Sequence, residues 1–204
     1  MHMRHIAQLT LSAAILVGAA PSAAASPANR GPACDAVRHA RVIAASPEAQ
    51  IYRAQNTLSQ PYFYGCAYRG RQRSYTLGPV TECVTPSGCG GTDQLTLSGA
   101  VAAYEAFDVD REVWLVVVRD LRSGRLLRRL STGGGFAKKI VVTPSGTVAW
   151  TVEAGLHEYE VHAVDATGSR VVSSGTDVAP RSLALAGNTL YWTQSGKAFS
   201  APLG

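Results

Sequence analysis

Glu158, Glu160 and His162 are the residues whose types and spacing come nearest to a metal site in this chain. They alternate with apolar residues, so on a β-strand their side chains share one face, about 7 Å from one to the next. Two carboxylates and an imidazole in such a row are ligands that zinc or manganese accepts. The same alternation is typical of a strand with one solvated face. We favour that interpretation, and we therefore expect no metal and no other cofactor.

A second acidic group lies at Asp108, Asp110 and Glu112. Its alternating carboxylates are similar to the start of a calcium-binding loop. The glycine and the distal glutamate that such a loop needs are missing. The segment is therefore predicted to be a polar hairpin connection.

Other catalytic motifs are absent or incomplete in the sequence. No G-x-S-x-G nucleophile motif occurs, and the glycine-rich segment Ser131–Gly135 lacks the Gly-Lys-Ser/Thr ending of a phosphate loop. We predict that Ser131–Gly135 is a flexible link between repeats. No catalytic residue is predicted, although a site assembled from loops of several repeats would leave no fixed spacing.

The four cysteines are Cys34, Cys66, Cys83 and Cys89. An even number in an exported chain is typical of disulfides, with three possible connectivities. Cys83 and Cys89 flank a segment with proline and glycine that can reverse direction, so a local bridge is the simplest pairing. This pairing leaves Cys34 for Cys66. Zinc and redox sites are disfavoured because no Cys-x-x-Cys pair is present.

The N-terminus has the order of a secretory signal peptide. Arg4 precedes a mostly apolar stretch at 6–20, and small residues follow at 22–25. We place the signal peptide at 1–25, with Ser26 as the first mature residue, and an N-terminal extension at 26–40. No second apolar run is long enough for a stable membrane anchor, so the protein is expected to be secreted, outside the cell or in the cell envelope.

The chain carries a formal net charge of +5. Its densest basic cluster contains Arg119, Arg122, Arg125, Arg128 and Arg129. A nucleic-acid surface interleaves such residues with stacking aromatics, whereas the neighbours here are leucines. The arginines are predicted to lie on the solvated side of a hairpin, and no nucleic-acid partner is expected. A weak affinity for anionic glycans or for the cell envelope stays open.

The elements that carry these residues are predicted to be strands joined by recurring turns. The turns Asp120–Gly124 and Asp165–Gly168 both begin with an aspartate able to bond the backbone two residues on, and both end in glycine. Gly70 lies in an earlier segment that is similar to this turn. The interval from Gly70 to Gly124 is longer than the next one because it contains an inserted disulfide loop at 78–91.

A second turn recurs ahead of these, at Gly99, Gly146 and Gly187. Periods of about 40–50 residues are typical of repeats of four strands. Segment 114–118 is apolar throughout, which predicts a central strand covered on both faces. Tyr104, Trp150 and Trp192 hold comparable repeat positions and are expected to face neighbouring sheets.

The turn Asp120–Gly124 and the Ser-Gly-x-Val-Ala sequences at Ser98 and Ser145 resemble the repeat of β-propeller proteins, which is common in exported bacterial proteins. The resemblance implies an all-β domain over 41–204. It would contain antiparallel four-stranded blades in a small or incomplete propeller of about four blades. A β-sandwich is the alternative. The last blade lacks a strand, and the segment before Val42 is expected near its open edge.

The predicted function is that of an exported, disulfide-stabilised binding or interaction module, with a glycan, the cell envelope or another protein as partner. One alternative is a carbohydrate- or ester-processing hydrolase or lyase with its site on the blade loops. Another is a structural module that completes its sheet with a partner. A concavity lined by convergent carboxylates or imidazoles would favour the enzyme, and an apolar one would favour binding.

Overall fold

The computed structural model describes Cys34 and residues 40–69, 74–80 and 94–204. Its strands form four antiparallel sheets that follow one another along the chain. Sheet 1 contains β1 (Arg41–Ala45), β2 (Ala49–Gln55), β3 (Pro61–Ala67) and β4 (Tyr75–Pro79). Sheet 2 contains β5 (Leu95–Ser98), β6 (Val101–Asp108), β7 (Val113–Asp120) and β8 (Leu126–Ser131). Sheet 3 contains β9 (Ala137–Val142), β10 (Val148–Gly155), β11 (Glu158–Asp165) and β12 (Gly168–Gly175). Sheet 4 contains β13 (Ala184–Ala186), β14 (Thr189–Gln194) and β15 (Lys197–Pro202).

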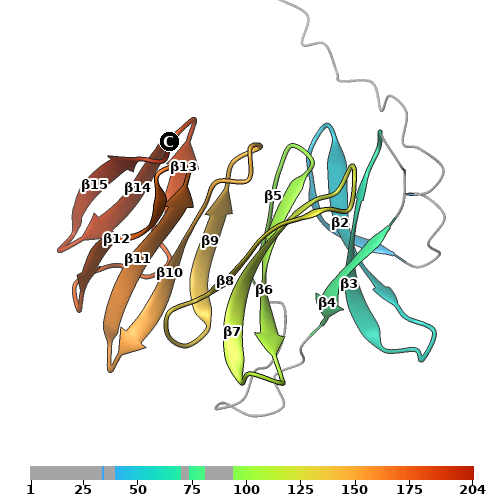
Figure 1. Cartoon of the computed structure of the whole chain (residues 1–204), viewed down its shortest axis with the longest axis horizontal. Helices are drawn as coiled ribbons and strands as arrows, with labels where there is room; N and C mark the ends of the chain where they lie inside the picture. The colour runs from blue at the N-terminus through green and yellow to red at the C-terminus, as the bar shows by residue number, and fades with distance from the viewer. Residues whose placement is uncertain (1–33, 35–39, 70–73, 81–93) are drawn as a thin grey trace, which may run out of the picture.

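The sheets stand in a row, from sheet 1 in blue and teal at one end to sheet 4 in red at the other (Figure 1). Within each sheet the strands pair in sequence order. An apolar cluster fills each of the three spaces between successive sheets. The prediction of an all-β chain with antiparallel sheets is confirmed, and four sheets are two more than a β-sandwich contains.

The three repeated aromatic residues face neighbouring sheets, as predicted. Tyr104 lies in one buried cluster with Ile51 and Phe63 of sheet 1. Trp150 packs against sheet 2, and Trp192 packs against sheet 3. Residues 115–118 of β7 are buried, with alternate side chains in the clusters on its two sides. The predicted buried central strand is therefore correct for residues 115–118, whereas Trp114 is only partly buried.

Equivalent turns join equivalent strands. Gly124 lies between the third and fourth strands of sheet 2, and Gly168 begins the fourth strand of sheet 3, with φ of +76° and +117°. There, glycine avoids the strain that a side chain causes at positive φ. The Asp120 carboxylate accepts a hydrogen bond from Arg122 N at 3.0 Å, and Asp165 accepts one from Thr167 N at 2.8 Å. The predicted aspartate turns are confirmed at both places, whereas Gly70 lies outside the described residues.

Two further features recur from sheet to sheet. The hairpins between first and second strands contain Gly99, Gly146 and Gly187, all at positive φ. The residue that follows the third strand donates its N–H to a carbonyl of this hairpin in sheets 1, 2 and 4: Tyr68 to Glu48, Leu121 to Ala100 and Leu203 to Asn188. The repetition therefore extends to individual backbone hydrogen bonds.

Two expectations about the N-terminal half need correction. Cys34 is bonded to Cys66 in β3, and sheets 1 and 4 lie at opposite ends of the molecule (Figure 1). The expectation that the segment before Val42 lies near the open edge of the last sheet is therefore wrong for its described part. Gly78 belongs to β4, so the predicted insertion does not begin there; the rest of it, from 81 on, lies outside the described residues. Within the described residues, no helix is long and apolar enough to span a membrane.

Candidate binding surface

The predicted polar row lies on β11, but only two of its members come together. Glu160 Oε2 and His162 Nε2 are 2.7 Å apart, whereas Glu158 is exposed at the hairpin that precedes them. Among the described residues, no group of three histidines, cysteines, aspartates or glutamates has the arrangement of a metal site. The row is therefore a carboxylate–imidazole pair rather than three convergent ligands.

His162 lies against the interface of sheets 2 and 3 instead of on a fully solvated face. Its ring stacks on Trp150, with ring centroids 5.1 Å apart. Trp150 Nε1 donates a hydrogen bond of 2.8 Å to Thr132 O in the link between β8 and β9. A Cβ at Gly133 would lie 3.0 Å from the His162 ring. Within the predicted flexible link, Thr132 is fully buried, whereas Ser131 and Gly133–Gly135 are exposed.

The arginine cluster is engaged within the protein. Arg119 Nη1 donates to Gly124 O at 2.7 Å, and Arg128 Nε donates to Gly146 O at 3.0 Å. Arg122 forms an ion pair with Glu48, and Arg129 forms one with Asp108. Four of the five guanidinium groups are therefore bonded to groups of the protein itself, in a turn, within sheet 2 or across to a neighbouring sheet.

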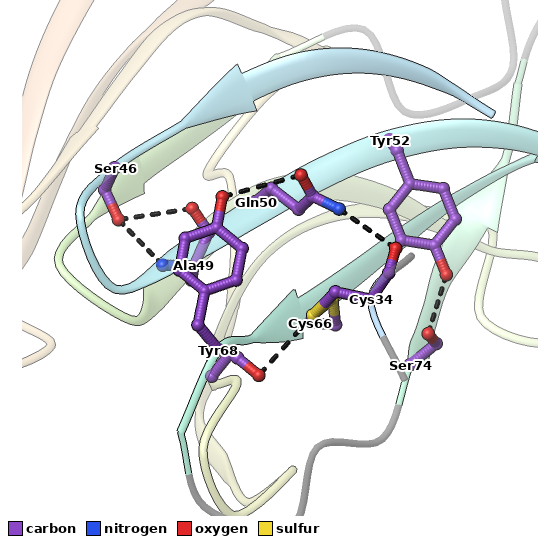
Figure 2. The surroundings of a disulfide bond; sticks show 9 residues. Cys34, Ser46, Ala49, Gln50, Tyr52, Cys66, Tyr68 and Ser74 are labelled. Carbon is purple, nitrogen blue, oxygen red and sulfur yellow. Dashed lines mark hydrogen bonds between the residues drawn. A yellow bond between two sulfur atoms is a disulfide. The ribbon is translucent and has the colours of Figure 1, made fainter. Parts of the chain in front are cut away.

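The predicted Cys34–Cys66 disulfide is present, and it lies on the outer face of sheet 1. Figure 2 shows its surroundings: Gln50 Nε2 donates to Cys34 O at 3.2 Å, and the Tyr52 hydroxyl bonds Ser74 Oγ at 2.6 Å. Burial of the Tyr52 phenol raises its pKa. On this face the crosslink lies in a small apolar cluster with Tyr52 and Ala54, and hydrogen bonds surround it. The predicted Cys83–Cys89 pair lies outside the described residues.

A shallow groove of about 380 Å³ crosses the first strands of sheets 2, 3 and 4. These strands lie next to one another, β5 beside β9 and β9 beside β13. Residues 96–98, Val141, Val142 and Leu185 line most of the groove. Its described lining contains no carboxylate and no imidazole. Such a lining can hold a ligand but offers no acid, base or nucleophilic pair for hydrolysis.

Three aromatic side chains gather where sheets 2 and 3 meet, at the end that carries the β6–β7 hairpin. The Trp114 ring lies 4.9 Å from Phe107 and 6.4 Å from Phe136, centroid to centroid. Phe107 is 40% exposed and Phe136 is 49% exposed. We call Phe107, Trp114 and Phe136 the aromatic cluster. Exposed rings in contact with one another are typical of ligand or partner surfaces.

Two ion pairs flank the aromatic cluster. Lys138 Nζ lies 3.8 Å from the centroid of the Phe136 ring and 2.8 Å from Glu153 Oε2. The Lys138 ammonium hydrogen-bonds Glu153 and lowers the pKa of that carboxyl. On the other side, Arg129 binds Asp108, the neighbour of Phe107. The surface thus combines apolar ring faces with hydrogen-bonding groups of both charges.

The aromatic cluster leaves no periodic signal in the sequence. The apolar run at 114–118 predicts a buried strand for Trp114, and Phe136 follows the glycine-rich link without any periodic pattern. The pairing of Phe107 with Trp114 across β6 and β7 follows from the hairpin register. The hairpin register is therefore the one feature from which the contact between these two rings is predictable.

Comparison with known proteins adds no assignment. No protein-family model matches the chain, and no curated protein sequence matches it significantly.

Proposed function

We propose that this chain is an exported glycan-binding module whose ligand packs on the aromatic cluster. Sugar rings present an apolar C–H face together with hydroxyl groups. Half-exposed Phe107 and Phe136 beside Trp114 offer matching ring faces, and the Lys138–Glu153 pair offers a donor and an acceptor at the rim. The observation that supports this proposal most directly is that exposed aromatic ring faces lie next to charged side chains.

The groove across the first strands supports binding over catalysis. A hydrolase or lyase needs convergent carboxylates or imidazoles at its concavity. The described lining of the groove is instead apolar and hydroxylic. The Glu160–His162 pair is in contact with Trp150 and with the β8–β9 link, so it serves packing in this interpretation.

Export and the propeller-like repeat belong to the same proposal. The segment order at 1–25 and the Cys34–Cys66 bridge support export. Equivalent turns, equivalent hydrogen bonds and inter-sheet aromatic residues support four consecutive blades, the last with three described strands. In this arrangement the first strands would line the central side and the aromatic cluster would lie on one end.

A glycan array followed by tryptophan fluorescence titration tests the proposal. Trp150 and Trp192 are buried, so a fluorescence change on binding reports mainly on Trp114. Phe136→Ala and Phe107→Ala should each weaken the affinity about tenfold, a loss of about 1.4 kcal/mol of binding free energy.

Leu156→Ala is the matched control, because Leu156 is 88% exposed at the tip of the neighbouring β10–β11 hairpin and lies outside the aromatic cluster. It should leave both affinity and stability unchanged. Absence of any bound glycan would contradict the proposal, and so would glycan binding that survives both phenylalanine substitutions.

A further inference from the structure

The outer edge of β15 differs from the equivalent edge of every other sheet. β15 is the third strand of sheet 4, equivalent to β3, β7 and β11. Those three strands pair with β4, β8 and β12, whereas among the described residues no strand pairs with the far side of β15. An unpaired edge presents free N–H and C=O groups to another strand.

Hydrogen bonding within sheet 4 identifies the groups at this edge. Leu203 N donates to Asn188 O at 2.7 Å, so the backbone N–H and C=O of Leu203 point to the β14 side of the strand. Because these directions alternate along a strand, Ala201 and Phe199 also face β14, and Ala198 and Ser200 face outward. Two N–H donors and two C=O acceptors are therefore available on the outer edge. The next outward carbonyl, that of Pro202, already accepts a hydrogen bond of 2.9 Å from Arg170 Nη2.

The strand is also regular, unlike the outer strands of the other sheets. Register shifts interrupt the pairing of β4, β8 and β12 with their neighbours, and such bulges discourage further pairing. β15 pairs with β14 at six consecutive positions without a shift. Its single charged residue is Lys197 at one end, and its other residues carry no charge. Phe199, in the middle, is 43% exposed.

We propose that β15 is a self-association site at which a second copy of this chain supplies the missing strand. Two β15 strands pair antiparallel about a two-fold axis at Phe199. Ala198 then lies opposite Ser200 of the partner subunit, and the same pair recurs on the other side of the axis. Four backbone hydrogen bonds form, and the two three-stranded sheets become one six-stranded sheet.

A second copy fits this edge better than an unrelated strand for two reasons. The outward groups of Ala198 and Ser200 are symmetric about Phe199, so the edge is complementary to itself, as a two-fold interface requires. In this register Lys197 lies opposite Ala201 of the partner subunit, so like charges do not face each other. Phe199 of the partner subunit also meets the stack of Phe199 on Trp192, whose ring centroids are 6.0 Å apart.

Sedimentation velocity of the purified protein from micromolar to submillimolar concentration tests the site. An edge-only interface is smaller than a standard one, so a weak, concentration-dependent dimer is expected. Ser200→Pro removes an outward N–H that β14 does not use, and it should raise the dimer dissociation constant at least about tenfold without changing the melting temperature.

Cysteine crosslinking tests the register. Phe199→Cys places two thiols across a close, non-hydrogen-bonded pair, and oxidation should give a covalent dimer. Tyr191→Cys on β14 is the control, since Tyr191 is equally exposed at 42% and lies away from the axis; it should not crosslink.

A protein that stays monomeric throughout the range overturns the proposal, as does a dimer that Ser200→Pro does not weaken. An Ser200 N–H that is protected from hydrogen exchange in the monomer also overturns it, because a segment of the same chain would then cover the edge. The site is separate from the aromatic cluster, so glycan binding and self-association can fail independently.

Discussion

Sheets 1 and 4 stand at the two ends of the row, and in the part of the chain that the structure describes each has one face that no neighbouring sheet covers (Figure 1). On the outer face of sheet 1, Gln50, Tyr52 and Cys66 are buried, and the last of these is bonded to Cys34. In sheet 4, by contrast, β15 is exposed along almost its whole length. A disulfide therefore crosslinks sheet 1 at one end of the row, whereas β15 at the other end has an edge that no described strand pairs with.

The difference shows that equivalent strands need not contribute equally to stability. A crosslink at sheet 1 restricts the unfolded chain as well as covering an apolar face. Among the described residues, sheet 4 has one strand fewer. It is held to sheet 3 by the Trp192 cluster, by Arg170 and by hydrogen bonds of Gln194 with Ser173 and Ser174. We therefore expect sheet 4 to open before sheet 1, with sub-global unfolding free energies that increase towards sheet 1.

The largest effect is expected from Leu121, whose counterpart in sheet 4 is Leu203. Both residues follow a third strand, both are about 1% exposed, and both donate to the preceding hairpin. Leu121 fills the space beside Gly65, where a Cβ would lie 2.7 Å from its Cδ2. Leu121→Ala should cost about 4 kcal/mol of unfolding free energy, and Leu203→Ala about 2 kcal/mol because the open end can collapse around it.

Urea denaturation of the two leucine variants measures both costs. The comparison of the two ends fails if Leu203→Ala is as destabilising as Leu121→Ala. Val109→Ala, in an exposed hairpin tip, is the control and should change stability by less than about 0.5 kcal/mol.

Removal of the disulfide should have the next largest effect. The bond joins residues separated by 32 positions, and the double substitution of Cys34 and Cys66 by alanine should cost about 3.7 kcal/mol on the loop-entropy model. Hydrogen exchange should show the loss in β2 and β3, with β14 and β15 unchanged. An equal loss of protection in sheet 4 would mean that the row unfolds as one unit and that its ends do not differ.

Much of the fold was predictable because turns leave strong local signals. Aspartate and glycine at Asp120–Gly124 and Asp165–Gly168 specify their turns from nearest-neighbour chemistry alone. The Cys34–Cys66 pairing followed from the limited choice among four cysteines. The inter-sheet positions of Tyr104, Trp150 and Trp192 followed from their repeat spacing.

The candidate site was less predictable because its contacts cross between sheets. Phe136 meets Trp114 through the path of the β8–β9 link, which no sequence period encodes. His162 alternates like a solvated residue, yet it is stacked on Trp150 from the neighbouring strand. Alternation indicates which face a side chain occupies, but it does not indicate what covers that face.

Acid should weaken the open end selectively through Asp165, the smallest of the expected effects. The Thr167 hydroxyl and the Arg170 guanidinium lower the pKa of Asp165 to about 2, from an ordinary value of 3.8. Arg170 Nη1 lies 2.6 Å from Asp165 Oδ2, while its Nη2 binds the Pro202 carbonyl of β15. The ionised carboxylate therefore positions the guanidinium that holds sheet 4 to sheet 3.

Because the pKa of Asp165 is lower in the folded protein than in the unfolded chain, ionisation stabilises the fold. The contribution is complete above about pH 4 and is lost as the pH falls towards about 2. Asp165→Asn should cost about 1 kcal/mol at neutral pH, and it should flatten the decline in unfolding free energy between pH 4 and pH 2.

Hydrogen exchange at pH 3 should then show β15 opening in the wild type while β2 stays protected by the disulfide. Asp120→Asn, in the equivalent turn of sheet 2, is the matched control and should leave exchange in β15 unchanged. If the two substitutions affect exchange in β15 equally, Asp165 stabilises only its own turn, and Arg170 does not contribute to the stability of β15.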